Sequence, residues 1–204
     1  MMENIEQFVD EQLDRLAGEM DQLDLNKWCA WLGTYRANLI PEKELLAAYV
    51  GERNGSNGTL RAIQAVIERG GYTVSRCRMS ERGLMGQANY WRRTIRIRAG
   101  LPYDVQTSLL VHEWTHMLIH AGEVGWFKTT DQKELEAEAT AYVVCQALGI
   151  KTQHSPIYLR ICYMLPSAEL YDPESRRYIA LAAKHIVRKL EEAGLICGEK
   201  AGSE

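Results

Sequence analysis

The sequence predicts an α+β fold, in which a small, mostly antiparallel sheet flanks one central helix and further helices surround both. Three observations lead to this prediction. Apolar residues recur every three or four positions through the N-terminal third, as in amphipathic helices. Residues 90–98 instead alternate apolar and polar side chains, as a half-buried strand does. Helical spacing then returns, and 204 residues suit one compact core.

The N-terminal part is expected to be helical. The apolar pattern places helices over residues 5–20, 25–39, 41–49 and 60–69. Thr59 is a candidate N-cap for the last of these, and the pair Gly70 and Gly71 is expected to end it. No internal repeat interrupts this series.

Two strands and three helices are expected in the rest of the chain. Residues 72–79 and 90–98 are predicted strands, forming a hairpin or small sheet with one apolar face and one arginine face. The later helices are predicted over residues 104–121, 131–148 and 173–193. Each of them is followed by a glycine, and Asp172 with Pro173 is a typical helix start.

We divide the chain into a helical N-terminal region (residues 1–71) that packs on the core, a main domain (72–196) and a flexible tail (197–204). The first residues do not resemble a signal peptide, and no apolar run has the length of a membrane span. We therefore expect a cytoplasmic protein without a membrane partner. The five cysteines lack CxxC spacing and are expected to be reduced: Cys29, Cys77, Cys145, Cys162 and Cys197.

The strongest chemical signal is the HExxH motif formed by His112, Glu113 and His116. Residues four apart stand above one another on a helix, so both imidazoles can face one ion. Glu113 lies about 100° further round the helix, where its carboxylate can take a proton from an activated water. This pattern predicts a catalytic zinc ion, one per chain, with Glu113 as the base. Histidine and carboxylate ligands also suit other divalent ions.

A catalytic zinc site needs a third protein ligand, and residues 133–145 offer three glutamates. Glu138 shares an otherwise apolar helix face, where a carboxylate requires a partner, so we predict it to be the ligand. Glu134 lies one turn earlier on that face and is the second candidate, or a group that orients a histidine. Glu136 lies off the face and is expected to be solvated.

The segments LVHEWTHMLIH and ELEAEATAYVVCQALGI resemble the ImmA/IrrE family of metallopeptidases and, more closely, the zincin domain of ArdC-type anti-restriction proteins. The resemblance covers roughly residues 90–150. It implies a zincin-like, gluzincin-type fold for residues 72–196, with His112, His116 and Glu138 as ligands and Glu113 as the base. No helix-turn-helix or single-stranded-DNA-binding domain of the kind found in these families is recognisable in the first 70 residues.

A zinc peptidase of this kind requires a further hydrogen-bond donor for the oxyanion. Four residues are candidates on the basis of type and position: His120, His154, Tyr158 and Tyr163. The sequence does not choose between them.

Residues 72–98 carry seven arginines and one glutamate, a charge of +6 within a chain of net charge −3. Arginines on a solvated sheet face, which also protect an edge, are one interpretation. A second is binding of single-stranded DNA through Arg92, Arg93, Arg96 and Arg98, helped by nearby aromatic rings. The third is attraction of an acidic protein substrate to the cleft.

Two functions follow from these patterns. The first is a zinc endopeptidase that hydrolyses an intracellular protein, such as a repressor or regulator. The alternative is an anti-restriction or single-stranded-DNA-binding protein of a mobile element, with a structural or inactive zincin core.

Overall fold

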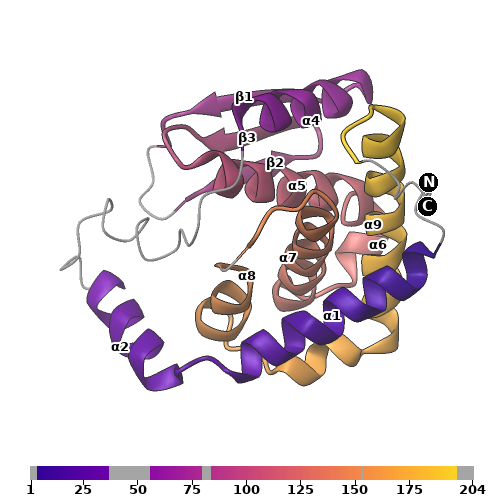
Figure 1. Cartoon of the computed structure of the whole chain (residues 1–204). Helices are drawn as coiled ribbons and strands as arrows, with labels where there is room; N and C mark the ends of the chain where they lie inside the picture. Colours follow the sequence, from indigo (N-terminus) through magenta and orange to yellow (C-terminus); the bar gives the residue numbers. More distant parts are fainter. Residues whose placement is uncertain (1–3, 37–55, 80–83, 153, 197–204) are drawn as a thin grey trace, which may run out of the picture.

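The computed structural model describes residues 4–36, 56–79, 84–152 and 154–196, which form an α+β fold (Figure 1). The helix expected over residues 41–49, one of the seven arginines of residues 72–98 (Arg82) and the tail 197–204 lie outside the described residues. The helices before the sheet are α1 (Ile5–Asp21), α2 (Leu25–Arg36) and α4 (Asn57–Arg69). The strands are β1 (Thr73–Cys77), β2 (Gly86–Asn89) and β3 (Thr94–Arg98). The remaining elements are α5 (Tyr103–Ile119), α6 (Glu123–Trp126), α7 (Thr130–Ala147), α8 (His154–Ile157), the π-helix η1 (Tyr158–Cys162), the 3₁₀ helix η2 (Ser167–Tyr171) and α9 (Pro173–Glu192).

The sheet has the strand order β1-β3-β2 and is mixed rather than mostly antiparallel. The two predicted strands, expected to form a hairpin or small sheet, correspond to β1 and β3, which are parallel neighbours in a sheet rather than a hairpin, with Thr73 opposite Thr94. The antiparallel partner of β3 is β2, which the sequence pattern did not reveal. Four residues rich in glycine, alanine and amide side chains have neither the alternation nor the β-branched composition of a typical strand. In the strand order β1-β3-β2, β2 is an edge strand and β3 is the central strand.

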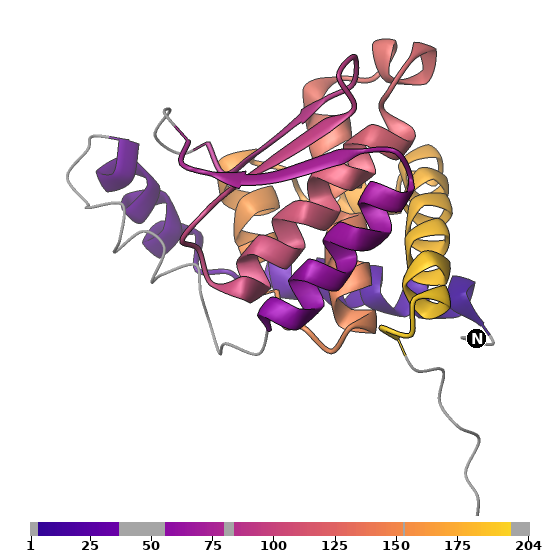
Figure 2. The ribbon, with the colours of Figure 1, turned by 90° about the horizontal axis from the view of Figure 1, so that it is seen from above.

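Two apolar clusters meet at α7, the middle helix of the molecule (Figure 1). One cluster lies between the sheet, α4, α5 and α9, and includes Ile63, Ile95 and Leu110. The other lies between α7, α1 and α9, and includes Leu13 and Tyr142. Figure 2 shows the sheet as a layer over α4 and α5. The division of the chain at residue 71 stays a prediction, although α4 shares a core with the sheet and α5.

Helix α7 has no solvated stripe over its central turns, because all residues from Leu135 to Cys145 are buried. Its start is fixed by a capping box, in which Thr129 and Gln132 satisfy each other's backbone N–H groups. A helix that is buried all round must satisfy its polar side chains within the protein. The glutamates of α7 therefore face neighbouring elements, which places the candidate site inside the molecule.

The helix termini agree partly with the expected signals. Asp172 caps α9 by accepting the N–H of Ser175 at 2.8 Å, and Pro173 is the first helical residue, as predicted. The cap of α4 is Ser56 rather than Thr59, since its hydroxyl accepts the Thr59 N–H at 3.0 Å. Within the described ranges, no helix combines the length and the apolar character that a membrane span requires.

Candidate metal centre

Helix α5 brings His112 and His116 together on one face, as the HExxH spacing predicts. Both side chains are buried, and their Nε2 atoms lie 3.1 Å apart. Burial lowers the pKa of His112, but hydrogen bonds to Glu134 and Glu138 outweigh it and leave that pKa well above the ordinary value. Burial lowers the pKa of His116 to about 4. The two glutamates thus favour a positive charge on His112, whereas His116 stays neutral.

Glu134 on α7 faces both of these nitrogens. Its Oε2 atom is 3.4 Å from Nε2 of His112, and its Oε1 atom is 3.5 Å from Nε2 of His116. Two imidazole nitrogens and a carboxylate oxygen form a donor set that suits a metal ion. Donor atoms about 2.0–2.1 Å from a tetrahedral ion are separated by about 3.3 Å from one another, close to the distances found here. The three-ligand group of His112, His116 and Glu134 could therefore hold a metal ion.

Glu138, the residue predicted to be the third ligand, lies on the other side of His112. Its Oε2 atom is 2.8 Å from Nδ1 of that histidine. A carboxylate with a lowered pKa only accepts hydrogen bonds, so His112 donates to it from Nδ1, and Nε2 is the nitrogen that an ion could bind in place of a proton. The geometry thus favours the second candidate, Glu134, as the third ligand. Glu134 faces the ion position, and Glu138 orients His112.

Glu136 was expected to be solvated, and this was wrong. Its side chain is 1% exposed and accepts hydrogen bonds from three directions. His120 Nε2 is 2.9 Å from Oε2, Ser175 Oγ donates to Oε1 at 3.0 Å, and Lys128 Nζ lies within 2.7 Å of both oxygens. The expectation failed because α9 and the segment before α7 cover this side of α7, which no local pattern on α7 encodes.

Glu113, the predicted base, lies between the ion position and the sheet. Its side chain is buried, and the backbone N–H of Ala88 in β2 donates a hydrogen bond to its carboxylate. Burial raises the pKa of Glu113 to about 7, while His112 lowers it and the charge of Glu134 adds to the rise. A carboxyl group with a pKa near neutrality can both accept and release a proton. The position of the Glu113 carboxyl group beside the edge strand β2 is the feature of the site that bears most directly on function.

Two tyrosines adjoin the three-ligand group. The hydroxyl of Tyr158 donates to Oε2 of Glu134 at 3.1 Å, and its ring meets His112 edge-on with centroids 6.0 Å apart. Burial raises the pKa of Tyr158 far above its ordinary value, which keeps it a neutral donor. Tyr90, which sequence reasoning considered only as an aromatic of the arginine segment, also faces the site. Burial raises the pKa of Tyr90, and the charges of Glu113 and Glu134 raise it further.

The other candidate donors lie elsewhere. His120 is behind His116, with the two Nδ1 atoms 2.8 Å apart. His154 contacts Ser108 Oγ at 3.0 Å and lies 3.9 Å from Glu138, so it belongs to the surroundings of that carboxylate. Tyr163 packs beside Tyr158 with ring centroids 5.2 Å apart. Of the four candidates, Tyr158 is therefore the one whose hydroxyl contacts Glu134 of the three-ligand group.

The four arginines proposed as an anion-binding row do not share one role. Arg93 donates to the carbonyl of Gly70 at 3.0 Å and stacks over a tyrosine ring, and Arg98 is buried and donates to the carbonyl of Leu84 at 2.9 Å. Arg92 and Arg96 are exposed. Near them in the β2–β3 turn, Trp91 is 94% exposed. DNA binding by this surface stays a prediction.

No protein-family model, curated protein or solved structure matches this chain. The resemblance to metallopeptidase families stays a prediction, and the functional argument depends on the geometry of the site.

Proposed function

We propose that this chain is a metal-dependent endopeptidase, with zinc as the metal and an intracellular protein as the substrate. The observation that carries the proposal is the position of Glu113. Its carboxylate lies between the three-ligand group and the edge strand β2, held there by the Ala88 N–H. A buried carboxylate in that position can serve chemistry on a peptide that lies along β2.

The edge of β2 supports a polypeptide substrate. Among the described strands, β2 pairs only with β3, so its outer edge has no strand partner, and of the groups there the Ala88 N–H donates to Glu113. An extended peptide can add to such an edge through main-chain hydrogen bonds. Glu113 contacts β2, so a peptide bound there passes beside the base.

The residues of the site have separable roles in this proposal. His112, His116 and Glu134 would hold zinc, which supplies Lewis-acid chemistry by polarising a carbonyl and acidifying water. Glu113 accepts a proton from water at its carboxylate and donates it to the leaving amine. Tyr158 offers a neutral hydroxyl next to the ligands, where it can donate to the oxyanion.

The test uses the full chain loaded with zinc and a pooled library of internally quenched peptides. Glu113→Gln should reduce the cleavage rate about 10²- to 10⁴-fold, because it removes the base. Elemental mass spectrometry should still find about one zinc per chain in this variant, since Glu113 lies outside the three-ligand group. Glu174→Gln, on an exposed position of α9, is the matched control and should cleave like the wild type. Equal cleavage by Glu113→Gln would overturn the proposal, as would a zinc-loaded wild type that cleaves no peptide.

A further inference from the structure

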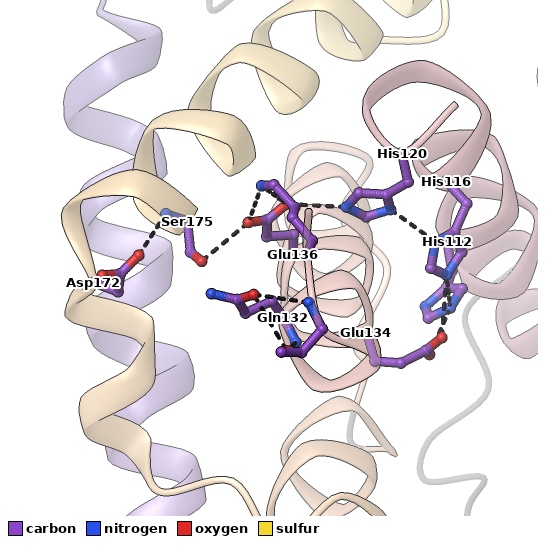
Figure 3. A network of polar contacts seen from close by, with 10 residues as sticks. His112, His116, His120, Gln132, Glu134, Glu136, Asp172 and Ser175 are labelled. Carbon is purple, nitrogen blue, oxygen red and sulfur yellow. Dashed lines mark hydrogen bonds and ion pairs between the residues drawn. The ribbon is translucent and has the colours of Figure 1, made fainter. Parts of the chain in front are cut away.

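A buried chain of polar side chains leads from the metal centre to α9 (Figure 3). It begins at Nδ1 of His116, which lies 2.8 Å from Nδ1 of His120. Nε2 of His120 lies 2.9 Å from Glu136. Glu136 in turn accepts hydrogen bonds from Lys128 and Ser175. We call His120, Glu136, Lys128 and Ser175 the support chain.

We propose that His120 is a positioning residue for His116, and that the support chain fixes the tautomer and orientation in which His116 binds the metal. This inference depends on the metal site of the proposed function. It adds four residues beyond the ligands themselves: His120 at the end of α5, Lys128 before α7, Glu136 on α7 and Ser175 on α9. None of them is part of the HExxH motif.

The hydrogen-bond directions follow from the outer end of the chain. The carboxylate of Glu136 can only accept, so Nε2 of His120 must donate to it. Neutral His120 then presents a lone pair at Nδ1, and Nδ1 of His116 must donate to that lone pair. His116 is left with its lone pair on Nε2, the atom that faces His112 and Glu134. The chain therefore selects the one neutral tautomer of His116 that can bind a metal.

The charge balance of the chain supports a neutral His120. Lys128 gives Glu136 its counter-charge, with Nζ 2.5 Å from Oε1 and a side chain that is only 6% exposed. The same ammonium lies 3.4 Å above the centroid of the Tyr178 ring on α9. An imidazolium at residue 120 is therefore not needed to compensate the buried carboxylate. If His120 were doubly protonated, its Nδ1–H would point at His116 and force a proton onto the metal-binding nitrogen.

The backbone at His120 is fixed as well. His120 is the C-cap of α5, and its N–H donates to the carbonyl of His116 at 3.1 Å. Gly125 of α6 lies against the carbonyl of His120, so that a Cβ atom at residue 125 would come 1.9 Å from that oxygen. Any larger residue would displace one of the two segments. The position of the imidazole is thus set from the backbone side and from Glu136.

The two ligand histidines are oriented differently. His112 is held directly by Glu138, whereas His116 is held by a carboxylate through an intervening imidazole. His120 can be substituted while Glu136 and Glu138 stay in place. Variants at this position therefore test the support chain separately from the ligands.

The experiment measures affinity for zinc by chelator competition and the visible spectrum of the cobalt(II)-loaded full chain. His120→Phe keeps a ring but removes both nitrogens, and it should weaken zinc binding about 10- to 100-fold and shift the cobalt absorption bands. His120→Asn can place an amide oxygen near the position of Nδ1, and it should recover part of the affinity. His185→Phe changes an exposed histidine of α9 and should match the wild type.

A second variant tests the outer end of the chain and covers the case in which His120→Phe fails to fold. Glu136→Gln combined with Lys128→Met removes both charges together, which avoids an unpaired buried charge, and leaves an acceptor for His120. It should bind zinc more weakly than the wild type, because a neutral amide holds the His120 N–H less strongly than a carboxylate does, and an unchanged zinc affinity and cobalt spectrum would overturn the inference. Wild-type affinity and an unchanged cobalt spectrum in the folded His120 variants would overturn the inference alone. A wild type that binds neither metal would overturn the proposed function together with it.

Discussion

Gly86 of β2 lies directly against the carboxylate of Glu113. A Cβ atom built on Gly86 would come 2.3 Å from Oε1 and 2.9 Å from the carboxyl carbon, distances at which atoms must move apart. Glu113 and the edge strand are therefore in contact, and residue 86 has room only for a hydrogen. This contact fixes where the Glu113 carboxylate lies relative to the strand.

We predict that Gly86→Ala lowers peptide cleavage by at least about tenfold, because small misplacements of catalytic groups have large effects on rate. Zinc affinity should stay unchanged, since Glu113 is not in the three-ligand group. Gly18→Ala is the control: its Cβ would meet no atom within 4 Å, and alanine in a helix stabilises by about 0.5–1 kcal/mol. A Gly86→Ala variant as active as Gly18→Ala would show that Glu113 does not need this position.

The assignment of the third ligand can be decided by comparing Glu134→Gln with Glu138→Gln. Glu138 orients His112 through Nδ1, and loss of such a partner weakens metal affinity about 10- to 100-fold. Glu134 faces both Nε2 atoms, so its loss should weaken zinc binding further. Zinc dissociation constants from chelator competition provide the comparison. The opposite order would restore Glu138 as the ligand.

The pKa of Glu113 predicts a pH dependence of stability in the metal-free protein. Burial raises this pKa from the model-peptide value of 4.5 to about 7, so the folded state binds a proton more tightly than the unfolded state does. The favourable contribution is complete below pH 4.5 and is lost as the pH rises through about 7. Glu113→Gln has no such loss. Its stability relative to the wild type should increase by about 2 kcal/mol between pH 5 and pH 8.

Urea unfolding of both proteins at these two pH values, with chelator present, measures this difference. The chelator matters because a bound cation would lower the pKa of Glu113 again. A difference that stays constant with pH would mean that Glu113 titrates at an ordinary value and is more solvated than its burial indicates.

Several elements follow from local patterns because local forces decide them. The spacing of His112 and His116 places them on one face in any α-helix, and Asp172 with Pro173 starts α9 as such pairs do. Strand β3 follows from its alternating side chains. Strand β2 has no such signal, since it exists through its pairing with β3. The parallel pairing of β1 and β3 likewise depends on contacts between residues far apart in the sequence.

The sequence by itself determined the α+β class and the placing of His112 and His116 on one helix face, because each depends on residue type and spacing within one segment. Only the tertiary structure decided what Glu134, Glu136 and Glu138 do. These three residues lie within about one helical turn of one another, so helical periodicity alone does not distinguish their roles. Their roles depend on how α7 packs between α5 and α9. That packing places Glu134 at both Nε2 atoms, Glu138 behind His112, and Glu136 against Lys128 and Ser175.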